Sequence, residues 1–201
     1  MKQFKGYEAA AKNANYSSSE KLPAGAYVCK VMNVKYEEGQ NGNSDYIKLQ
    51  FDISEGDYKD FFLNQYNAST LEDKKFKGQA TIYIPKDDGT ERDGWTANNF
   101  ATWTTGFESS NNGYHWDWDE NKWKGLTIGI VFGETGTVID GKEIVYTEAR
   151  RGCSADFVRE GKAPKAKFKA KNGYGNGSSA PTSSNDFVSI PDTNLTEIPF
   201  N

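Results

Sequence analysis

Tyr46-Ile-Lys-Leu-Gln-Phe-Asp-Ile53 is the stretch that decides the fold of this chain. Apolar side chains occupy every second position from Ile47 to Ile53, and the positions between them are charged or polar. Side chains of a β-strand point alternately to opposite faces, so this pattern predicts a strand with one face on a core and the other in solvent. Tyr46 and Lys48 are expected on the solvent face.

The neighbouring segments extend this strand into a β-domain. Residues 26–36 are mostly β-branched, aromatic or small, and the loop 38–44 consists almost entirely of turn-forming residues, which predicts a hairpin with 46–53. Apolar side chains recur at helical spacing over 95–107, which predicts a helix with Asp93 as its N-cap. Further strands are expected over 57–63, 80–84, 125–133 and 143–150, and a short capped helix over 154–159.

This order of elements predicts an all-β fold with one or two short helices. It matches an OB-fold-like five-stranded barrel, and a β-sandwich fits nearly as well. Beyond Gly161 the composition becomes Lys/Ala/Pro-rich and then Gly/Ser/Asn-rich, which buries too little apolar surface to order the chain. The predicted organisation is an N-terminal arm (1–21), an OB-like domain (22–161), a flexible linker (162–185) and a disordered docking tail (186–201).

The net charge of −4 conceals an uneven distribution. Residues 161–201 carry five lysines and three acids, so the acidic excess lies in the first 160 residues. A surface that binds polyanions usually shows a basic footprint. This balance therefore favours ring stacking over charge as the source of any affinity for nucleic acid.

Several classes of protein are disfavoured by the composition. No stretch approaches the roughly 20 apolar residues of a membrane span, and Met1–Tyr16 lacks the apolar core of a secretory signal, so we expect a soluble, cytoplasmic protein with no membrane partner. Cys29 and Cys153 belong to no metal-ligand spacing and are expected to be reduced, buried thiols. No metal or organic cofactor is expected.

The tail carries apolar residues that have no core to join, which suits them to insertion into a pocket of a partner protein. Its ending, Glu197-Ile-Pro-Phe200, resembles the acidic tip of bacterial single-stranded-DNA-binding proteins, in which several aspartates precede Ile-Pro-Phe. This chain departs from that pattern because its acids are diluted and Asn201 follows the phenylalanine. The resemblance implies that the tip recruits replication and recombination proteins through Asp192, Glu197, Ile198, Pro199 and Phe200.

Three segments of the domain are similar to a phage and prophage family of Gram-positive hosts regarded as single-stranded-DNA-binding replication proteins. They are Lys21-Leu-Pro-Ala-Gly-Ala-Tyr27, Phe51-Asp-Ile-Ser-Glu-Gly-Asp-Tyr58 and Gly125-Leu-Thr-Ile-Gly-Ile-Val-Phe132. The resemblance runs from about residue 4 to the end, and it implies sequence-independent binding of single-stranded DNA in phage DNA replication or recombination. It leaves open whether the protein is a monomer or a homo-oligomer.

Sequence-independent binding of single strands relies on aromatic rings that stack on bases, with cations nearby for the phosphates. Each candidate tyrosine also fits an ordinary half-buried sheet residue, and the arginine pair also fits a solvated surface. The tryptophan-rich stretch 114–123 fits either a stacking loop or a plug that closes the end of the barrel. The candidates are Lys35, Tyr36, Tyr46, Lys48, Lys59, Tyr66, Trp116, Trp118, Arg150 and Arg151.

Other functions find weaker support. Asp117, Asp119 and Glu120 could supply the carboxylate pair of a glycosidase, but adjacent acids are common on solvated loops. His115 is the only histidine, and no nucleophile triad or phosphate-binding glycine loop is visible, so we expect no enzymatic activity. The main alternative is a carbohydrate-binding β-domain that stacks sugars on Trp116, Trp118 and Trp123.

Overall fold

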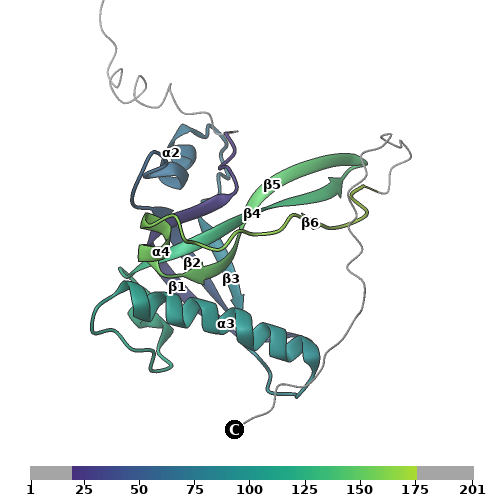
Figure 1. Ribbon diagram of the computed structural model, residues 1–201. Helices are drawn as coiled ribbons and strands as arrows, with labels where there is room; N and C mark the ends of the chain where they lie inside the picture. The colour runs from purple at the N-terminus through teal and green to yellow at the C-terminus, as the bar shows by residue number, and fades with distance from the viewer. Residues whose placement is uncertain (1–19, 176–201) are drawn as a thin grey trace, which may run out of the picture.

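The computed structural model of the chain describes residues 20–175. Its centre is a six-stranded, mainly antiparallel sheet with the order β3-β2-β1-β4-β5, and the short β6 pairs in parallel with β4 (Figure 1). The sheet is not closed, because β3 and β5 end this path without pairing to each other. Its elements are β1 (Gly25–Glu37), β2 (Tyr46–Ile53), α2 (Phe61–Ala68), β3 (Gln79–Tyr83), α3 (Glu91–Ser110), the 3-10 helix η1 (Glu120–Trp123), β4 (Thr127–Ile139), β5 (Lys142–Cys153), α4 (Ala155–Arg159) and β6 (Lys169–Ala170).

The predicted hairpin of β1 and β2 is confirmed. The two strands are antiparallel, with Lys35 opposite Lys48 and Glu37 opposite Tyr46. The β1–β2 pairing shifts its register between Val31 and Asn33, and the other edge of β1 pairs with β4. The predicted all-β fold class is confirmed to the extent that the fold is mostly β-sheet. Three α-helices occur among the described residues, where one or two were expected.

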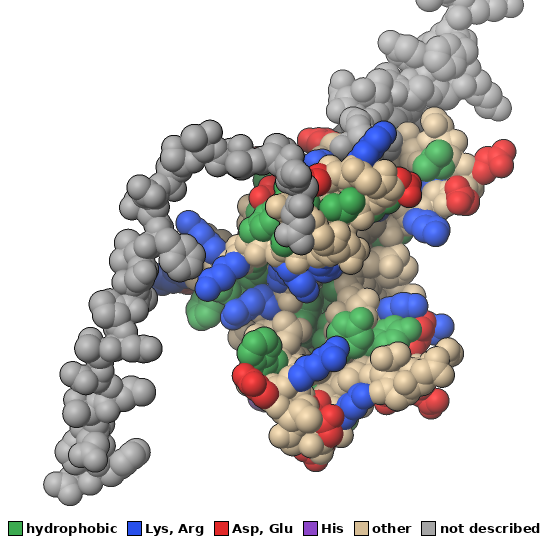
Figure 2. All heavy atoms as spheres, turned by 90° about the vertical axis from the view of Figure 1, so that its right-hand side faces the viewer, with side chains coloured by type: hydrophobic (Ala, Val, Ile, Leu, Met, Phe, Trp, Pro, Cys, Tyr) green, Lys and Arg blue, Asp and Glu red, His purple; other side chains and the backbone are tan. Residues whose placement is uncertain are grey.

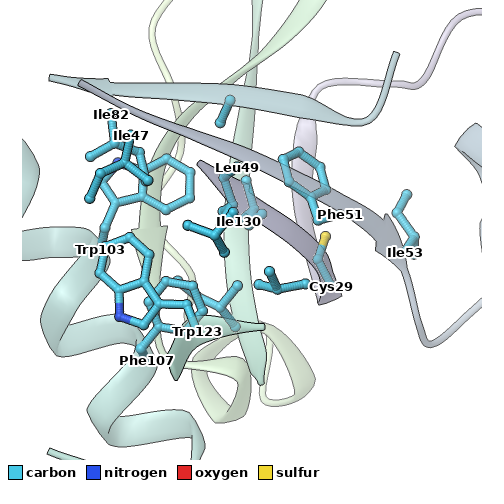
Figure 3. Close-up of a cluster of buried hydrophobic side chains, with 14 of the residues drawn as sticks. Cys29, Ile47, Leu49, Phe51, Ile53, Ile82, Trp103, Phe107, Trp123 and Ile130 are labelled. Carbon is cyan, nitrogen blue, oxygen red and sulfur yellow. The ribbon is translucent and has the colours of Figure 1, made fainter. Parts of the chain in front are cut away.

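The alternation in β2 directs one row of apolar side chains into the core, as the sequence predicts. Ile47, Leu49, Phe51 and Ile53 are all buried, and they share one cluster with residues of α3 and η1 (Figure 3). Helix α3 covers this face of the sheet with the predicted apolar positions Phe100, Trp103 and Phe107. Trp95, the first residue of that expected pattern, is instead 70% exposed.

The N-cap of α3 lies three residues before the predicted one. Thr90 has an extended backbone, and its side chain accepts the backbone N–H of Asp93 at 3.2 Å. The carboxylate of Asp93 accepts the backbone N–H groups of Lys86 and Asp87 instead. Asp93 therefore fixes the loop that enters the helix. The predicted short helix with its Ser154 cap is confirmed as α4.

The prediction of a strand over 57–63 is wrong. These residues form a turn and the start of α2, with Asp60 in the left-handed region at φ 58°. The carboxylate of Asp52, at the end of β2, accepts the backbone N–H groups of Phe62 at 3.0 Å and Leu63 at 2.8 Å. A buried acceptor thus satisfies N–H groups that the first turn of a helix leaves free.

Strands β4 and β5 are longer than predicted and continue past the body of the sheet as a projecting hairpin, which we call the arm (Figure 1). The arm turns at Asp140 and Gly141, as expected. Residues 162–175, which the sequence analysis assigned to a flexible linker, lie along the arm and include β6. The remainder of that linker and the docking tail lie outside the described residues.

Both cysteines are buried free thiols, as predicted. Burial raises the pKa of the Cys29 thiol well above its ordinary value and also raises the pKa of Cys153. Among residues 20–175, no helix is long and apolar enough to cross a membrane.

Candidate nucleic-acid interface

Strands β1, β2 and β3 present one face to the core and a second, polar face to solvent. On the polar face Tyr46 lies directly across from Tyr83 of β3, with ring centroids 6.0 Å apart and planes tilted by 59°. Tyr83 is 55% exposed, and the ammonium group of Lys48 lies 5.5 Å from the centroid of Tyr46. The result is a pair of adjacent rings with a cation beside them, which we call the tyrosine pair.

Glu37 lies beside the tyrosine pair, and its carboxylate holds the Tyr46 hydroxyl and the two neighbouring lysines. Its carboxylate accepts hydrogen bonds from the Tyr46 hydroxyl at 2.7 Å and from Lys48 at 3.0 Å, and it pairs with Lys35 at 3.1 Å. The Tyr46 hydrogen bond first, and then the two lysines, lower the pKa of Glu37 to about 2. The same hydrogen bond raises the pKa of Tyr46. Two positive charges and one negative charge therefore lie close together beside the tyrosine pair.

Tyr36 does not belong to the tyrosine pair. It lies opposite the buried Ile47 in the sheet, so its side chain leaves β1 on the core-facing side and emerges at the end of the strand. Its hydroxyl donates to Asp45 at 2.6 Å, and this bond is the first cause of a pKa raised to about 12. Tyr36 therefore fastens the end of the β1–β2 loop.

Lys59 and Tyr66 lie at the other end of β2 and β3 from the tyrosine pair, because α2 follows the last residue of β2 and precedes the first of β3. Lys59 is exposed in the turn before α2. Tyr66 packs on Phe76 at 6.2 Å, and the Lys74 ammonium lies 4.6 Å from its centroid. Tyr66 and Lys74 line a pocket together with Leu71 and Lys75. An eight-residue strand spans about 23 Å, so this is a separate surface.

Residues 114–123, which we call the tryptophan loop, pack mainly into the core, and one tryptophan ring remains exposed. Trp123 is fully buried and stacks on Phe107 at 4.6 Å, and Trp116 lies 4.8 Å from Trp123. Trp118 is 77% exposed, stacks on Phe100 of α3 at 6.4 Å and has a left-handed backbone at φ 67°. The loop packs on α3, so it lies on the opposite side of the sheet from the tyrosine pair.

Carboxylates surround the exposed tryptophan. Asp117 and Asp119 flank Trp118 in sequence, and Glu108 accepts the backbone N–H of Trp116 at 2.9 Å. Asp117 pairs with Lys122, whose hydrogen bond is the first cause of its lowered pKa. Fixed negative charge opposes a phosphate chain at this position. Trp116 and Trp118 are thus poorly placed for the predicted role in nucleic-acid binding.

The two arginines have different environments. Arg150 is largely covered, pairs with Glu148 at 2.7 Å and donates to the backbone carbonyl of Glu134 at 3.0 Å and to the Thr135 hydroxyl. Its guanidinium therefore joins β5 to β4 inside the arm and has little capacity left for a phosphate. Arg151, opposite Val131, is exposed.

The sequence reasoning missed Tyr83. The signal was present, because the alternation in residues 80–84 that predicted β3 also places Tyr83 on the solvent face beside Tyr46. Lys35, Tyr46 and Lys48 are the predicted residues that the structure brings together; the others lie on separate surfaces. Asp192, Glu197, Ile198, Pro199 and Phe200 lie outside the described residues.

Lysine and arginine side chains gather around a hollowed waist on the side of the molecule that carries the arm (Figure 2).

No group of three or more His, Cys, Asp and Glu between residues 20 and 175 is arranged to hold a metal ion. The sequence matches no protein-family model, and no curated protein matches it.

Proposed function

We propose that this chain binds single-stranded DNA without sequence preference, as a phage-type replication or recombination protein. The observation that carries the proposal is the tyrosine pair, in which Tyr46 and the exposed Tyr83 lie side by side on neighbouring strands with Lys48 next to them. Stacking on such rings is worth about 1–3 kcal/mol per base and accepts any base. The lysines supply charge for the phosphates that connect the stacked bases.

An OB-like reading of the sheet supports this proposal. In OB-folds, which are partly open five-stranded barrels, oligonucleotides bind on the face of the second and third strands and on the loops between strands one and two and between strands four and five. The tyrosine pair joins the second and third strands here, and α3 lies between the third and the fourth. The strands β3 and β5 at the two ends of the path approach each other without pairing.

Recruitment of replication and recombination proteins by the C-terminal tip is a separate part of the proposal. It is supported by the sequence Glu197-Ile-Pro-Phe200 and its resemblance to the tip of bacterial single-stranded-DNA-binding proteins. A short acidic and apolar segment on a polar linker can insert its aromatic ring into a partner pocket with a basic rim. Binding and recruitment then reside in different parts of the chain.

The test is a titration of labelled oligo-dT with the full chain, followed by fluorescence anisotropy, against a duplex of the same length. The expected result is saturable binding of oligo-dT, with mixed-sequence single strands bound equally well and the duplex bound at least tenfold more weakly, because paired bases cannot reach the rings. Equal affinity for duplex and single strand, or no binding to either, would overturn the proposal.

Carbohydrate binding is the second candidate, and Trp118 is the observation that favours it. The ring of Trp118 is 77% exposed and stacks on Phe100, and the neighbouring carboxylates could accept hydrogen bonds from sugar hydroxyls. Xylo- and cello-oligosaccharides are therefore titrated against intrinsic tryptophan fluorescence in parallel. Saturable quenching by a sugar that disappears in Trp118→Ala, together with no binding of oligo-dT, would favour this candidate.

A further inference from the structure

Residues 161–175 concentrate positive charge at the end of the described chain. The segment contains five lysines and no acid, whereas the chain as a whole is acidic. Lys162 and Lys171 are paired with Glu160 at 2.7 Å and Glu148 at 3.2 Å. Lys165, Lys167 and Lys169 are exposed, and no ion pair within residues 20–175 involves them. We call these three residues the lysine ladder.

The segment is held against the arm rather than left free. β6 pairs with β4 at Thr135 and Gly136, and the backbone N–H of Lys171 donates to the carbonyl of Gly136 at 2.8 Å. The amide of Asn172 donates to Thr137 at 3.2 Å. β6 thus occupies the edge of β4 beyond Phe132, which lies opposite Gly25, the first residue of β1 (Figure 1).

Two glycines of β4 make room for this contact. A Cβ at Gly133 would lie 2.6 Å from the Cβ of Ala166, and a Cβ at Gly136 would lie 2.7 Å from the ring of Tyr174. Both distances are far below van der Waals contact, so a larger residue at either position would displace the segment. Residues 166 and 174 therefore lie against β4 at positions where only glycine leaves room for them.

Alternation in this extended segment determines which way the lysines point. Ala166 turns to Gly133, and the ring of Phe168 packs on Tyr174 at 5.5 Å. Lys165, Lys167 and Lys169 alternate with Ala166 and Phe168 along the segment. Alternate residues of an extended chain lie about 6.6 Å apart. Successive phosphates along one strand of nucleic acid have a similar separation.

We propose that the lysine ladder is a second DNA-contact site, which binds the phosphodiester backbone of single-stranded DNA. This inference rests on the proposed function and extends it. Stacking on the tyrosine pair holds bases, while the ladder holds phosphates through charge alone. It also explains how an acidic domain can bind a polyanion, because the uncompensated positive charge is fixed in one row on the arm.

The experiment compares two triple variants of the full chain with equal change in charge. The ladder variant carries Lys165→Gln, Lys167→Gln and Lys169→Gln. The control carries Lys21→Gln, Lys75→Gln and Lys124→Gln, which are also exposed lysines and lie outside the arm. The affinity for a long oligo-dT is measured by anisotropy over a series of salt concentrations. Thermal unfolding checks that both variants keep the Tm of the unmodified protein.

Each phosphate contact on a single strand contributes about 0.7 to the slope of log affinity against log salt. Loss of three contacts is therefore expected to flatten the slope by about 2 and to weaken binding of the order of 100-fold near 0.1 M salt. The control is expected to keep the slope within about 0.5 of the unmodified protein, less than one such contact.

Three outcomes are informative. If the ladder variant still binds oligo-dT with the salt slope of the unmodified protein, the lysine ladder is not a DNA contact, while the proposed function remains in place. Equal flattening in both variants would also overturn it, since net charge and not the ladder would then be responsible. A ladder variant that loses duplex binding and keeps its affinity for oligo-dT would show that the row holds double-stranded DNA, which likewise contradicts the proposal.

Discussion

The carboxylate of Asp52 accepts the backbone N–H of Phe62 at 3.0 Å, across ten residues of sequence, and so joins the end of β2 to the first turn of α2. Asp52 is only 8% exposed, and burial raises its pKa despite three backbone hydrogen bonds that oppose the shift. Asp52→Ala leaves these N–H groups without a partner. We expect it to lower the free energy of unfolding by about 2–3 kcal/mol, measured by urea denaturation. Glu72→Ala, an exposed acid, is the control, and an equal effect of both would contradict this role.

The tyrosine pair provides the sharpest test of where single-stranded DNA binds. Removal of both rings in Tyr46→Ala with Tyr83→Ala is expected to weaken binding of oligo-dT at least tenfold, because each stacked base contributes about 1–3 kcal/mol. Trp118→Ala removes an even more exposed ring on the other side of the sheet and should change the affinity less than twofold. Anisotropy of a labelled oligonucleotide measures both. The reverse order would move the interface to the tryptophan loop.

The lowered pKa of Glu37 predicts how the free energy of unfolding changes with pH. Its pKa in the folded chain is about 2, below the ordinary 4.5, so the folded state keeps this carboxylate ionised where the unfolded chain binds a proton. Its contribution to stability is therefore complete above about pH 4.5 and is lost as the pH falls towards 2. Glu37→Gln should lack this dependence. The difference in free energy of unfolding between the two proteins should shrink from pH 5 to pH 2.5, and a constant difference would contradict the assignment.

Gly136 tests whether the lysine ladder is held in place. A Cβ at this position would lie 2.7 Å from the Tyr174 ring, so Gly136→Ala should push residues 166–174 away from β4. Trypsin is then expected to cleave after the ladder lysines severalfold faster than in the unmodified protein. Gly94→Ala, on α3 with open space around the added methyl group, is the matched control. Unchanged cleavage in both would mean that the segment is not fastened there.

The C-terminal tip separates recruitment from DNA binding. Phe200→Ala should abolish the capture of replication proteins from a host lysate, since loss of a buried aromatic anchor costs about 2 kcal/mol or more. Deletion of residues 197–201 should leave the affinity for oligo-dT unchanged or slightly higher, because an acidic tethered segment competes weakly with phosphates. Retention of the same partners together with weaker DNA binding would place the tip in the DNA site.

The sequence by itself determined the parts of this protein in which a local pattern has one physical solution. Alternation over Tyr46–Ile53 defined β2, its core face and its solvent face, and the loop 38–44 defined the hairpin. The same reasoning, applied to residues 80–84, already contained Tyr83. These predictions hold because the direction of a side chain along a strand is set by the pleat and does not depend on distant contacts.

The tertiary structure decided what depends on partners far away in the sequence. Residues 57–63 have the composition of a strand, but the buried Asp52 carboxylate stabilises a helix start there. Arg150 is a plausible phosphate contact by sequence, but in the folded chain its guanidinium is taken up by the Glu148 carboxylate and the backbone carbonyl of Glu134. Residues 162–175 have the composition of a linker, but β6 pairs with β4, and the glycines at 133 and 136 leave room for this contact. Composition measures what a segment can bury by itself, whereas an edge on another strand is available only after folding.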